Sequence, residues 1–384
     1  MPIKAVILDL DGTLIDTTDN IVAGVPQMIS SLQQNGVAVY VASNRLPAPP
    51  VDFNGLGITP NEYLTRRRVG QRKGTGAFVD AVLANLRIER NELLYLGDSV
   101  NDMREAVNSK VAFFLAAWSN PTYSYGLAIK TPARFAHIVK TFFLKDKLWF
   151  YRINSVDHLT RTVAVRALLD PDTAISTGIR DLLKRNILGP PIKTYSLPAY
   201  LSFHLFSSVY LEGLHLHGSQ GGPTIWCIYP GHDGSQGRVL STFAQVVSRL
   251  FHDNYQPSLI NRHTPSIKSA YARWRGETVD FANQLKTINL SPALRRFIED
   301  RTILVFDDFT TEAYSFEAAR NFLYNAGARE VISIAVGKYR KPYYPHCPHP
   351  GVVWDSFAPA NLEDRDFRID AVEENYDLDA VTPF

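Results

Sequence analysis

A short apolar stretch that ends in paired acids constrains the fold of this chain most strongly. Residues 3–8, IKAVIL, form a β-branched run of the kind that lies inside a parallel sheet. DLDGT follows at once, at residues 9–13. Ligands of open α/β sheets bind at the carboxyl ends of the strands. The opening therefore predicts a buried first strand with a polar site at its carboxyl end.

Further strands alternate with helices in the first part of the chain. Apolar runs at 37–43, 91–97 and 110–116 predict strands, and the stretches between them predict helices. Strands that alternate with helices indicate an α/β fold with a doubly wound parallel sheet. We expect this first domain to span residues 1–145.

The composition excludes several classes of protein. The 384 residues are 45% hydrophobic and 20% charged, which is typical of a globular protein of two or three domains. The formal net charge is only +2 and the basic residues are dispersed, so the overall charge does not indicate nucleic-acid binding. Two cysteines argue against a disulfide scaffold and fit a reducing cytoplasm. The opening reads as a strand rather than a signal peptide, and no apolar run approaches the roughly 18 residues of a membrane span, so we expect a cytoplasmic protein.

Four motifs of the first domain resemble those of the haloacid dehalogenase-like (HAD) phosphatase superfamily. DLDGT at 9–13, Ser43 after the second strand, Lys73 in QRKGTG and GDSVND at 97–102 occur in that order. The resemblance covers about residues 1–145. It implies a Mg²⁺-dependent phosphohydrolase that forms an aspartyl-phosphate.

The resemblance also implies a role for each of these side chains. Asp9 would be the nucleophile, and Asp11 would protonate the leaving oxygen and then activate water. Ser43 and Lys73 would hold the phosphoryl oxygens. The implied magnesium site consists of four aspartates, of which the second acts through its backbone carbonyl: Asp9, Asp11, Asp98 and Asp102.

The residue types suit phosphoryl transfer. A hard cation held by carboxylates beside a lysine neutralises the charge of the transferred group. A carboxylate nucleophile divides hydrolysis into two displacements. The spacing of Asp98 and Asp102 places both on one face of a helix that begins after a strand.

The short spacing between the motifs predicts an open site. Only 34 positions separate Asp9 from Ser43, and 30 separate Ser43 from Lys73. Neither interval has room for the extra cap domain that many HAD enzymes insert. An open site suits a large substrate, or one that another part of the chain or a second subunit covers.

The second half of the chain also contains strands that end in polar residues. Apolar strands are predicted at 224–229, 302–308 and 330–339, with a glycine-rich turn and an amphipathic helix after the first. Together they predict a second doubly wound parallel sheet. The remaining predicted parts are a domain at 146–345, its connecting region at 146–190, which is either a helix or a hairpin, and an acidic C-terminal tail at 346–384.

VFDDFTTEAYS at 305–315 resembles the phosphoribosyl-diphosphate (PRPP) motif of type I phosphoribosyltransferases. With YPGHDGSQG at 229–237 it is most similar to the ComF branch, over about residues 190–345. The resemblance implies that the acid pair holds the ribose hydroxyls. The loop that follows would wrap a phosphate at a helix amino end, where partial positive charge favours an anion. The implied ligand-binding residues are Asp307, Asp308, Thr310, Thr311 and Ser315, with Gly231, Asp233, Gly234 and Ser235 at the diphosphate loop.

Two residues depart from that family's motif. Glu312 places a carboxylate beside the expected phosphate, which is unfavourable unless the side chain points away. Ala313 is not expected to reach the positive φ angles that are open to glycine. The second domain could therefore transfer a phosphoribosyl group, or only recognise PRPP, a nucleotide or a phosphorylated sugar. The basic residues of the expected mobile loop are Lys268, Arg273 and Arg275.

PHCPHPG at 345–351 contains His346, Cys347 and His349, residue types that can bind a metal ion. The lack of a second ligand pair, and three prolines in seven residues, favour a surface loop instead.

Three functions remain open from the sequence. The first is a fused enzyme that acts on a phosphorylated small molecule, either a nucleotide or a phosphoribosyl compound. In the second, the rear domain senses PRPP or a nucleotide and regulates the front enzyme or a protein partner. The third is processing of nucleic-acid ends, which the open site suits but the near-neutral charge supports little. The sequence leaves the oligomeric state open.

Overall fold

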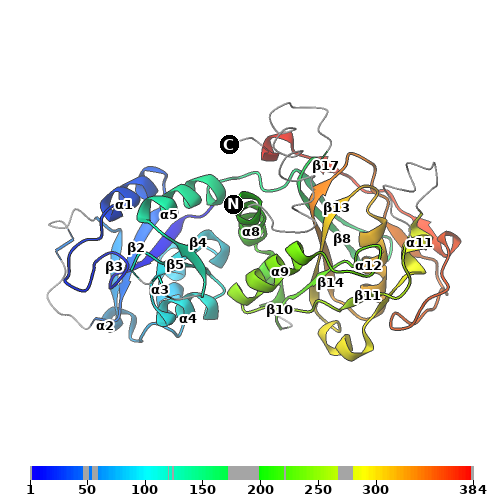
Figure 1. The fold of residues 1–384 in the computed structure, drawn as a ribbon, viewed down its shortest axis with the longest axis horizontal. Coiled ribbons are helices and arrows are strands. Elements are labelled where there is room, and N and C mark those ends of the chain that lie inside the picture. The colour runs from blue at the N-terminus through cyan, green and yellow to red at the C-terminus, as the bar shows by residue number, and fades with distance from the viewer. Residues whose placement is uncertain are drawn as a thin grey trace. The chain divides into compact units, whose positions relative to one another are not determined.

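The computed structural model forms two compact units (Figure 1). The first unit comprises Met1–Asp146, Val209–His215 and Leu250–His252, and the second comprises Lys147–Ser208, Leu216–Arg249 and Asp253–Phe384. The structure describes residues 2–45, 52–53, 59–119, 121–122, 125–171, 199–219, 222–266 and 280–381. Within these ranges, no helix is both long and apolar enough to cross a lipid bilayer.

A six-stranded parallel sheet lies at the centre of the first unit. Its strands are β1 (Ala5–Asp9), β2 (Ala38–Ser43), β3 (Glu62–Thr65), β4 (Leu93–Gly97), β5 (Ala112–Ala116) and β6 (Leu127–Ile129). The order is β3-β2-β1-β4-β5-β6, and every neighbouring pair is parallel. Chain order runs outward in opposite directions on the two sides of β1, which is the place where open α/β sheets bind ligands.

Helices cover both faces of this sheet. They are α1 (Val25–Gln34), α2 (Arg66–Val69), α3 (Ala77–Leu86), α4 (Val100–Asn108) and α5 (Pro132–Ile138), with short helical turns at Arg90–Glu92 and Val139–Phe143. Figure 1 shows α1 and α5 on one face and α3 and α4 on the other. All residues of β1, β4 and β5 are buried, as expected for strands with helices on both sides. The four strands predicted in this unit are confirmed, whereas the short edge strands β3 and β6 were not predicted.

The second unit contains a seven-stranded mixed sheet. Its strands are β7 (Tyr151–Val156), β8 (Thr162–Leu169), β9 (Ile225–Ile228), β10 (Asn254–Tyr255), β13 (Thr302–Thr310), β14 (Glu330–Lys338) and β17 (Asn375–Tyr376). The order is β10-β9-β13-β14-β8-β7-β17. The five strands from β10 to β8 are parallel, whereas β7 and β17 are antiparallel to their neighbours. The predicted wholly parallel sheet is therefore wrong at this edge, because a β7–β8 hairpin forms in the expected connecting region.

Smaller elements complete the second unit. Its helices are α9 (Arg238–Leu250), which lies in this unit except for its last residue, α11 (Phe281–Leu285) and α12 (Tyr314–Asn325), with short turns at Pro292–Phe297, Asp364–Asp366 and Leu378–Val381. Helix α8 (Ala199–Glu212) and the short turn at Leu214–Ser219 are divided between the two units, because Val209–His215 belongs to the first. Two separate strand pairs are β11 (Ile260–Arg262) with β12 (Ile288–Leu290), and β15 (His346–Pro348) with β16 (Phe367–Ile369). The expected acidic tail thus contributes β15, β16 and β17, and Leu362 and Phe367 join the core around α12.

A buried ion-pair network fastens α12 to the segments around it. The Arg320 side chain is only 2% exposed, and its guanidinium lies 2.7 Å from Glu317 Oε1 and 2.7 Å from Asp157 Oδ2. Glu317 also accepts hydrogen bonds from the His346 backbone N–H, at 2.6 Å, and from the Tyr343 hydroxyl. The network joins α12 to the β7–β8 turn and to β15.

Replacing Arg320 should destabilise the second unit strongly. Arg320→Ala leaves the Glu317 and Asp157 carboxylates buried without their partner, and breaking a buried pair in this way costs about 3–5 kcal/mol of unfolding free energy. Urea unfolding of the full chain would measure the loss. Arg365→Ala is the matched control, because the Arg365 side chain is 83% exposed in its pair with Glu363. Equal losses in the two variants would contradict the network's importance.

Candidate functional site

Three acids converge at the carboxyl edge of the first sheet. Asp9 is the last residue of β1, Asp98 follows β4 directly, and Asp102 lies in the first turn of α4. Carboxylate oxygens of these three residues all lie within 4.8 Å of one another. The structure therefore brings together three of the four aspartates for which the sequence predicts a metal role.

Glycine at position 12 permits the close approach of Asp98. Gly12 has φ of +77°, and a Cβ atom there would lie 2.1 Å from an Asp98 carboxylate oxygen. No other residue type fits this turn without displacing the acid. The packing explains why the opening strand is followed by Asp-Leu-Asp-Gly.

Lys73 supplies the balancing positive charge. Its buried ammonium forms an ion pair with Asp9 Oδ1 and lies 2.7 Å from Asp102 Oδ1. Burial lowers the pKa of Lys73, but the charges of Asp9 and Asp102 outweigh burial and raise the pKa above its ordinary value. The ammonium group therefore stays charged at neutral pH.

Two of the three acids have raised pKa values although Lys73 lies beside them. Burial, followed by the charge of Asp102, raises the pKa of Asp9 well above its ordinary range. Burial and Asp102 also raise the pKa of Asp98. A cluster of three carboxylates around one ammonium has an unbalanced negative charge, and oxygen donors of this kind suit Mg²⁺. The donor set thus fits a divalent cation held by Asp9, Asp98 and Asp102.

Asp11 and Ser43 meet beside this group. Ser43 ends β2, and its hydroxyl donates to Asp11 Oδ2 at 3.1 Å. The Asp11 side chain is 44% exposed and also forms an ion pair with Arg45, which pairs in turn with Asp19. The Asp11 carboxylate is not one of the three acids within 4.8 Å of one another, so its side chain lies on the solvent side of the site.

Glu105 fixes the loop that carries Lys73, and sequence analysis missed it. Its carboxylate is fully buried on α4, one turn after Asp102. It accepts five backbone hydrogen bonds of 2.7–3.2 Å, from the N–H groups of Gly74, Thr75, Gly76, Phe78 and Val79. The sequence contains two signals that could have pointed to Glu105. They are the two glycines just after Lys73 and the presence of an acid three residues after Asp102.

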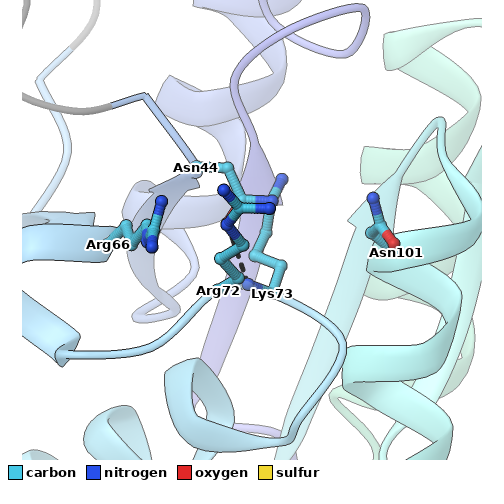
Figure 2. A pocket seen from close by; sticks show the side chains of 5 residues that line it. All are labelled: Asn44, Arg66, Arg72, Lys73 and Asn101. Atoms are coloured by element: carbon cyan, nitrogen blue, oxygen red, sulfur yellow. Dashed lines mark hydrogen bonds between the residues drawn. The ribbon is translucent and has the colours of Figure 1, made fainter.

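A cationic pocket adjoins Lys73 (Figure 2). It has a volume of about 430 Å³ and is lined by Asn44, Arg66, Arg72, Lys73 and Asn101. The Asn44 side chain accepts the Lys73 backbone N–H at 2.8 Å, as Figure 2 shows. Neither Arg66 nor Arg72 forms an ion pair with any residue that the structure describes. Two of the three cations that line the pocket therefore have no acidic partner among the described residues, which suits an anionic ligand.

The predicted acid pair of the second unit also lies at a sheet edge. Asp307 and Asp308 belong to the end of β13, which continues two residues beyond the prediction to Thr310. Ser315, in the first turn of α12, donates to Asp307 Oδ2 at 3.2 Å. Burial and the neighbouring Asp308 raise the pKa of Asp307 well above its ordinary range. Thr310 is buried, and the adjoining Thr311 is half-buried.

Ala313 corrects one expectation. It adopts a left-handed conformation with φ of 58° at the start of α12, so the prediction that it could not reach positive φ was wrong. A left-handed alanine costs only about 1–2 kcal/mol. Its methyl group is 2% exposed and packs in the core of the unit, which offsets part of that cost.

The loop after β9 lies at the same sheet edge, because β9 and β13 are neighbouring parallel strands. It closes as a tight turn, with Gly231 N–H 2.7 Å from the Ser235 carbonyl and Gly234 at φ of 81°. Ser235 donates its N–H to Asp233 at 3.0 Å. Arg262, which was not predicted, donates to the Gly231 carbonyl at 2.8 Å. Lys268, Arg273 and Arg275 lie outside the described residues.

Comparison with protein families gives a match that lies in the first unit. Residues 6–53 match the family of haloacid dehalogenase-like hydrolases, and this segment contains Asp9, Asp11 and Ser43. The chain is similar to a HAD-superfamily hydrolase of subfamily IA from Geobacter sulfurreducens, with 16% identity, 36% of this chain and 96% of that chain covered, and a TM-score of 0.32.

Two further solved structures have similar values. One is the cobalt-bound deoxy-D-mannose-octulosonate 8-phosphate phosphatase from Haemophilus influenzae, with 18% identity, coverage of 36% and 87%, and a TM-score of 0.29. The other is a D,D-heptose 1,7-bisphosphate phosphatase from B. bronchiseptica with magnesium and phosphate, with 16% identity, coverage of 35% and 97%, and a TM-score of 0.30. Comparison with curated proteins gives no match. The family match at residues 6–53 supports a haloacid dehalogenase-like hydrolase domain in the first unit.

Proposed function

We propose that the first unit is a metal-dependent phosphohydrolase with Asp9 as its nucleophile. The observation that carries this proposal is the buried Lys73 ammonium between Asp9 and Asp102, with Asp98 in the same group. The ammonium, together with a divalent cation on the acids, would neutralise the charge of a phosphoryl group that an Asp9 oxygen attacks. Mg²⁺ held by the three acids would supply further charge neutralisation.

The side chains suggest two displacements. In the first, an Asp9 oxygen bonds to phosphorus while the bond from phosphorus to the ester oxygen breaks, and Asp11 gives its proton to that oxygen. In the second, Asp11 takes a proton from water, whose oxygen displaces Asp9 and releases phosphate. The exposed position of Asp11 and its contact with Ser43 suit a group that meets both the leaving oxygen and water. Its ion pair with Arg45 must open for proton transfer.

The pocket beside Lys73 indicates the substrate class. Arg66 and Arg72 add two cations beside the place where the reacting phosphoryl group would bind, so a substrate with a second anionic group fits best. A nucleotide or another phosphorylated small molecule carries such a group. Nucleic-acid ends carry it too, but the formal charge of only +2 on the whole chain gives little support for polymer binding.

Removal of the proposed nucleophile tests this function. Asp9→Asn should reduce Mg²⁺-dependent phosphate release at least about 1,000-fold, because the first displacement cannot occur. A panel of phosphate monoesters, bisphosphates and nucleotides would measure release. Asp80→Asn, which alters a carboxylate that is 61% exposed in the same unit, should leave release unchanged. Release that survives in folded Asp9→Asn would refute the assignment.

Glu105 should act by positioning rather than by contact with substrate. Glu105→Gln keeps the shape of the side chain but leaves several of the five amide donors without a good acceptor. We expect a loss of about 2–3 kcal/mol in unfolding free energy, in line with hydrogen bonds to charged groups. We also expect kcat to fall about tenfold or more, since supporting residues typically have effects of that size. Urea unfolding and steady-state kinetics would measure both, and a variant indistinguishable from Asp80→Asn would contradict this role.

We further propose that the second unit binds PRPP or a nucleotide as a phosphoribosyltransferase-like domain. Two observations favour this. Asp307 and Ser315 are joined at the start of the 12-residue helix α12, where an anion is favoured. The turn at Gly231–Ser235 follows β9, the parallel neighbour of β13. This turn and the loop between β13 and α12 can therefore reach one ligand.

Calorimetry with PRPP tests the proposed ligand site of the second unit. Wild-type protein should bind saturably, and Asp307→Asn should weaken binding at least about tenfold through the loss of charge-assisted hydrogen bonds to ribose. Glu373→Gln, at an exposed position, is the matched control. Diphosphate release with added nucleobases would then indicate transfer, whereas binding without release would indicate sensing. If the wild-type protein binds neither PRPP nor nucleotides, the proposal is refuted.

A further inference from the structure

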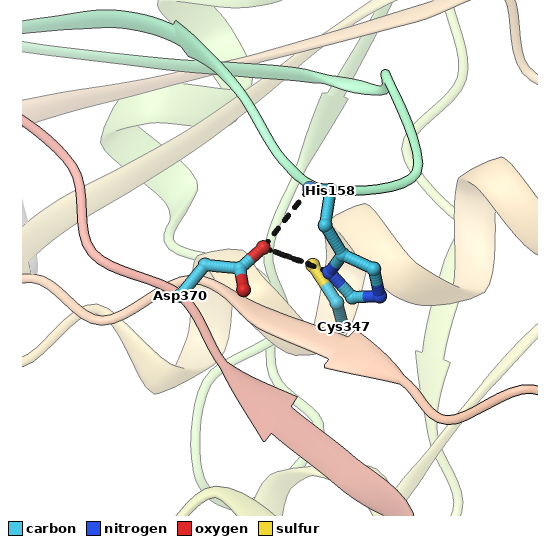
Figure 3. A group of neighbouring side chains, drawn as sticks. All are labelled: His158, Cys347 and Asp370. Carbon is cyan, nitrogen blue, oxygen red and sulfur yellow. Dashed lines mark hydrogen bonds and ion pairs between the residues drawn. The ribbon is translucent and has the colours of Figure 1, made fainter.

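We propose that the second unit contains a transition-metal site formed by His158, Cys347 and Asp370. Figure 3 shows the three side chains pointing toward one another. Their candidate ligand atoms, one from each residue, lie within 4.8 Å of one another. A divalent ion of the zinc class fits this set, because zinc accepts sulfur, nitrogen and oxygen ligands together.

The fold brings these residues together from distant parts of the sequence. His158 lies in the turn between β7 and β8, Cys347 is the middle residue of β15, and Asp370 follows β16. Pairing of Cys347 with Arg368 aligns β15 with β16, and the Asp370 N–H donates to the Pro345 carbonyl at 2.9 Å. The two antiparallel strands and the hairpin turn therefore hold the cluster from three sides.

This placement corrects the surface-loop interpretation of PHCPHPG at 345–351. Residues 346–348 form a strand, and His346 and Cys347 are buried. The sequence near this motif contains no second ligand pair. The missing partners come instead from His158 and Asp370, which only the folded chain brings to Cys347.

The distances are close to those of a coordinated ion. Cys347 Sγ lies 3.5 Å from Asp370 Oδ2, and His158 Nδ1 lies 2.9 Å from the same oxygen. Bonds of about 2.0–2.3 Å in a tetrahedral zinc site place ligand atoms roughly 3.3–3.6 Å apart. Binding therefore needs the His158–Asp370 distance to widen slightly, while the ligand atoms of His158 and Cys347 already lie within 4.8 Å of each other. The His158 side chain is 23% exposed in a turn, which leaves room for that shift and for a solvent ligand.

A nucleophilic role for Cys347 fits the geometry less well. Its sulfur contacts the Asp370 carboxylate, and the imidazole hydrogen-bonds to that carboxylate rather than to the thiol, which is unlike a cysteine that a histidine activates. Burial, together with Asp157, raises the pKa of Cys347 to about 12. A metal ion that takes the sulfur as thiolate releases the thiol proton to solvent.

The neighbouring cation does not exclude a metal ion. Arg320 Nη2 lies 3.8 Å from Cys347 Sγ, but its charge is matched by Glu317 and Asp157. Arg368 pairs with Asp370 Oδ1, and its side chain is 57% exposed. This arginine can move into solvent when the carboxylate takes a metal ion. The bound ion would link the β7–β8 turn to β15 and β16.

Cobalt titration of metal-free, full-length protein tests the site. Thiolate bonded to Co²⁺ gives a near-ultraviolet charge-transfer band, which the aspartates of the first unit cannot give. The chain has only two cysteines, Cys227 and Cys347, so the source of the band can be assigned. Wild-type protein and Cys227→Ala should show a band that saturates at one equivalent and disappears on addition of Zn²⁺. Cys347→Ala should show none.

His158→Ala keeps the test valid if the buried cysteine variant does not fold. This change lies in a partly exposed turn and removes one ligand while the thiol remains. It should weaken cobalt affinity at least tenfold, and Zn²⁺ should raise the unfolding temperature of wild-type protein but much less that of the variant. Absence of a saturable band in wild-type protein, or equal affinity in His158→Ala, would overturn the proposal.

Discussion

The buried ammonium of Lys73 is the interaction on which the first site depends. Asp9 and Asp102 are almost fully buried, and burial of carboxylates without a partner is far more costly than burial of a matched pair. Lys73 contacts both. The end of β1, the first turn of α4 and the loop before α3 must therefore meet at one point. A displacement of that loop would leave two buried acids unpaired.

Parallel strands explain why polar residues gather at one edge in each unit. In the first unit β1 lies between β2 and β4, and in the second β13 lies between β9 and β14. Each central strand carries acids at its carboxyl end, and the loops after its neighbours reach the same edge. The two units differ in the charge around the acids. A lysine lies among those of the first unit, whereas Asp307 is joined to Ser315 at a helix amino end, an arrangement better suited to hydroxyl and phosphate recognition than to phosphoryl transfer.

Sequence reasoning predicted what short segments encode. Apolar runs predicted seven of the parallel strands, and the polar residues at or just after the ends of these runs included Asp9, Asp98 and Asp307. Short edge strands such as β3 and β6 were missed because three or four residues carry too weak a pattern. Contacts between segments that are distant in the sequence could not be predicted from local patterns either. Glu105 binds a loop about 30 residues earlier, and Cys347 meets a histidine almost 190 residues away.

Both units also use a buried glutamate on a helix to organise other segments. Glu105 holds five backbone amides around the Lys73 loop, and Glu317 binds Arg320, the Tyr343 hydroxyl and the His346 amide. A buried carboxylate is tolerated only when its oxygens are nearly saturated with donors. Each glutamate therefore imposes one geometry on its surroundings, because any alternative leaves a charge unsatisfied. At Glu105, backbone donors fix the position of the loop that carries Lys73. At Glu317, the charged partner Arg320 extends the same constraint to Asp157, which precedes His158 of the proposed metal site.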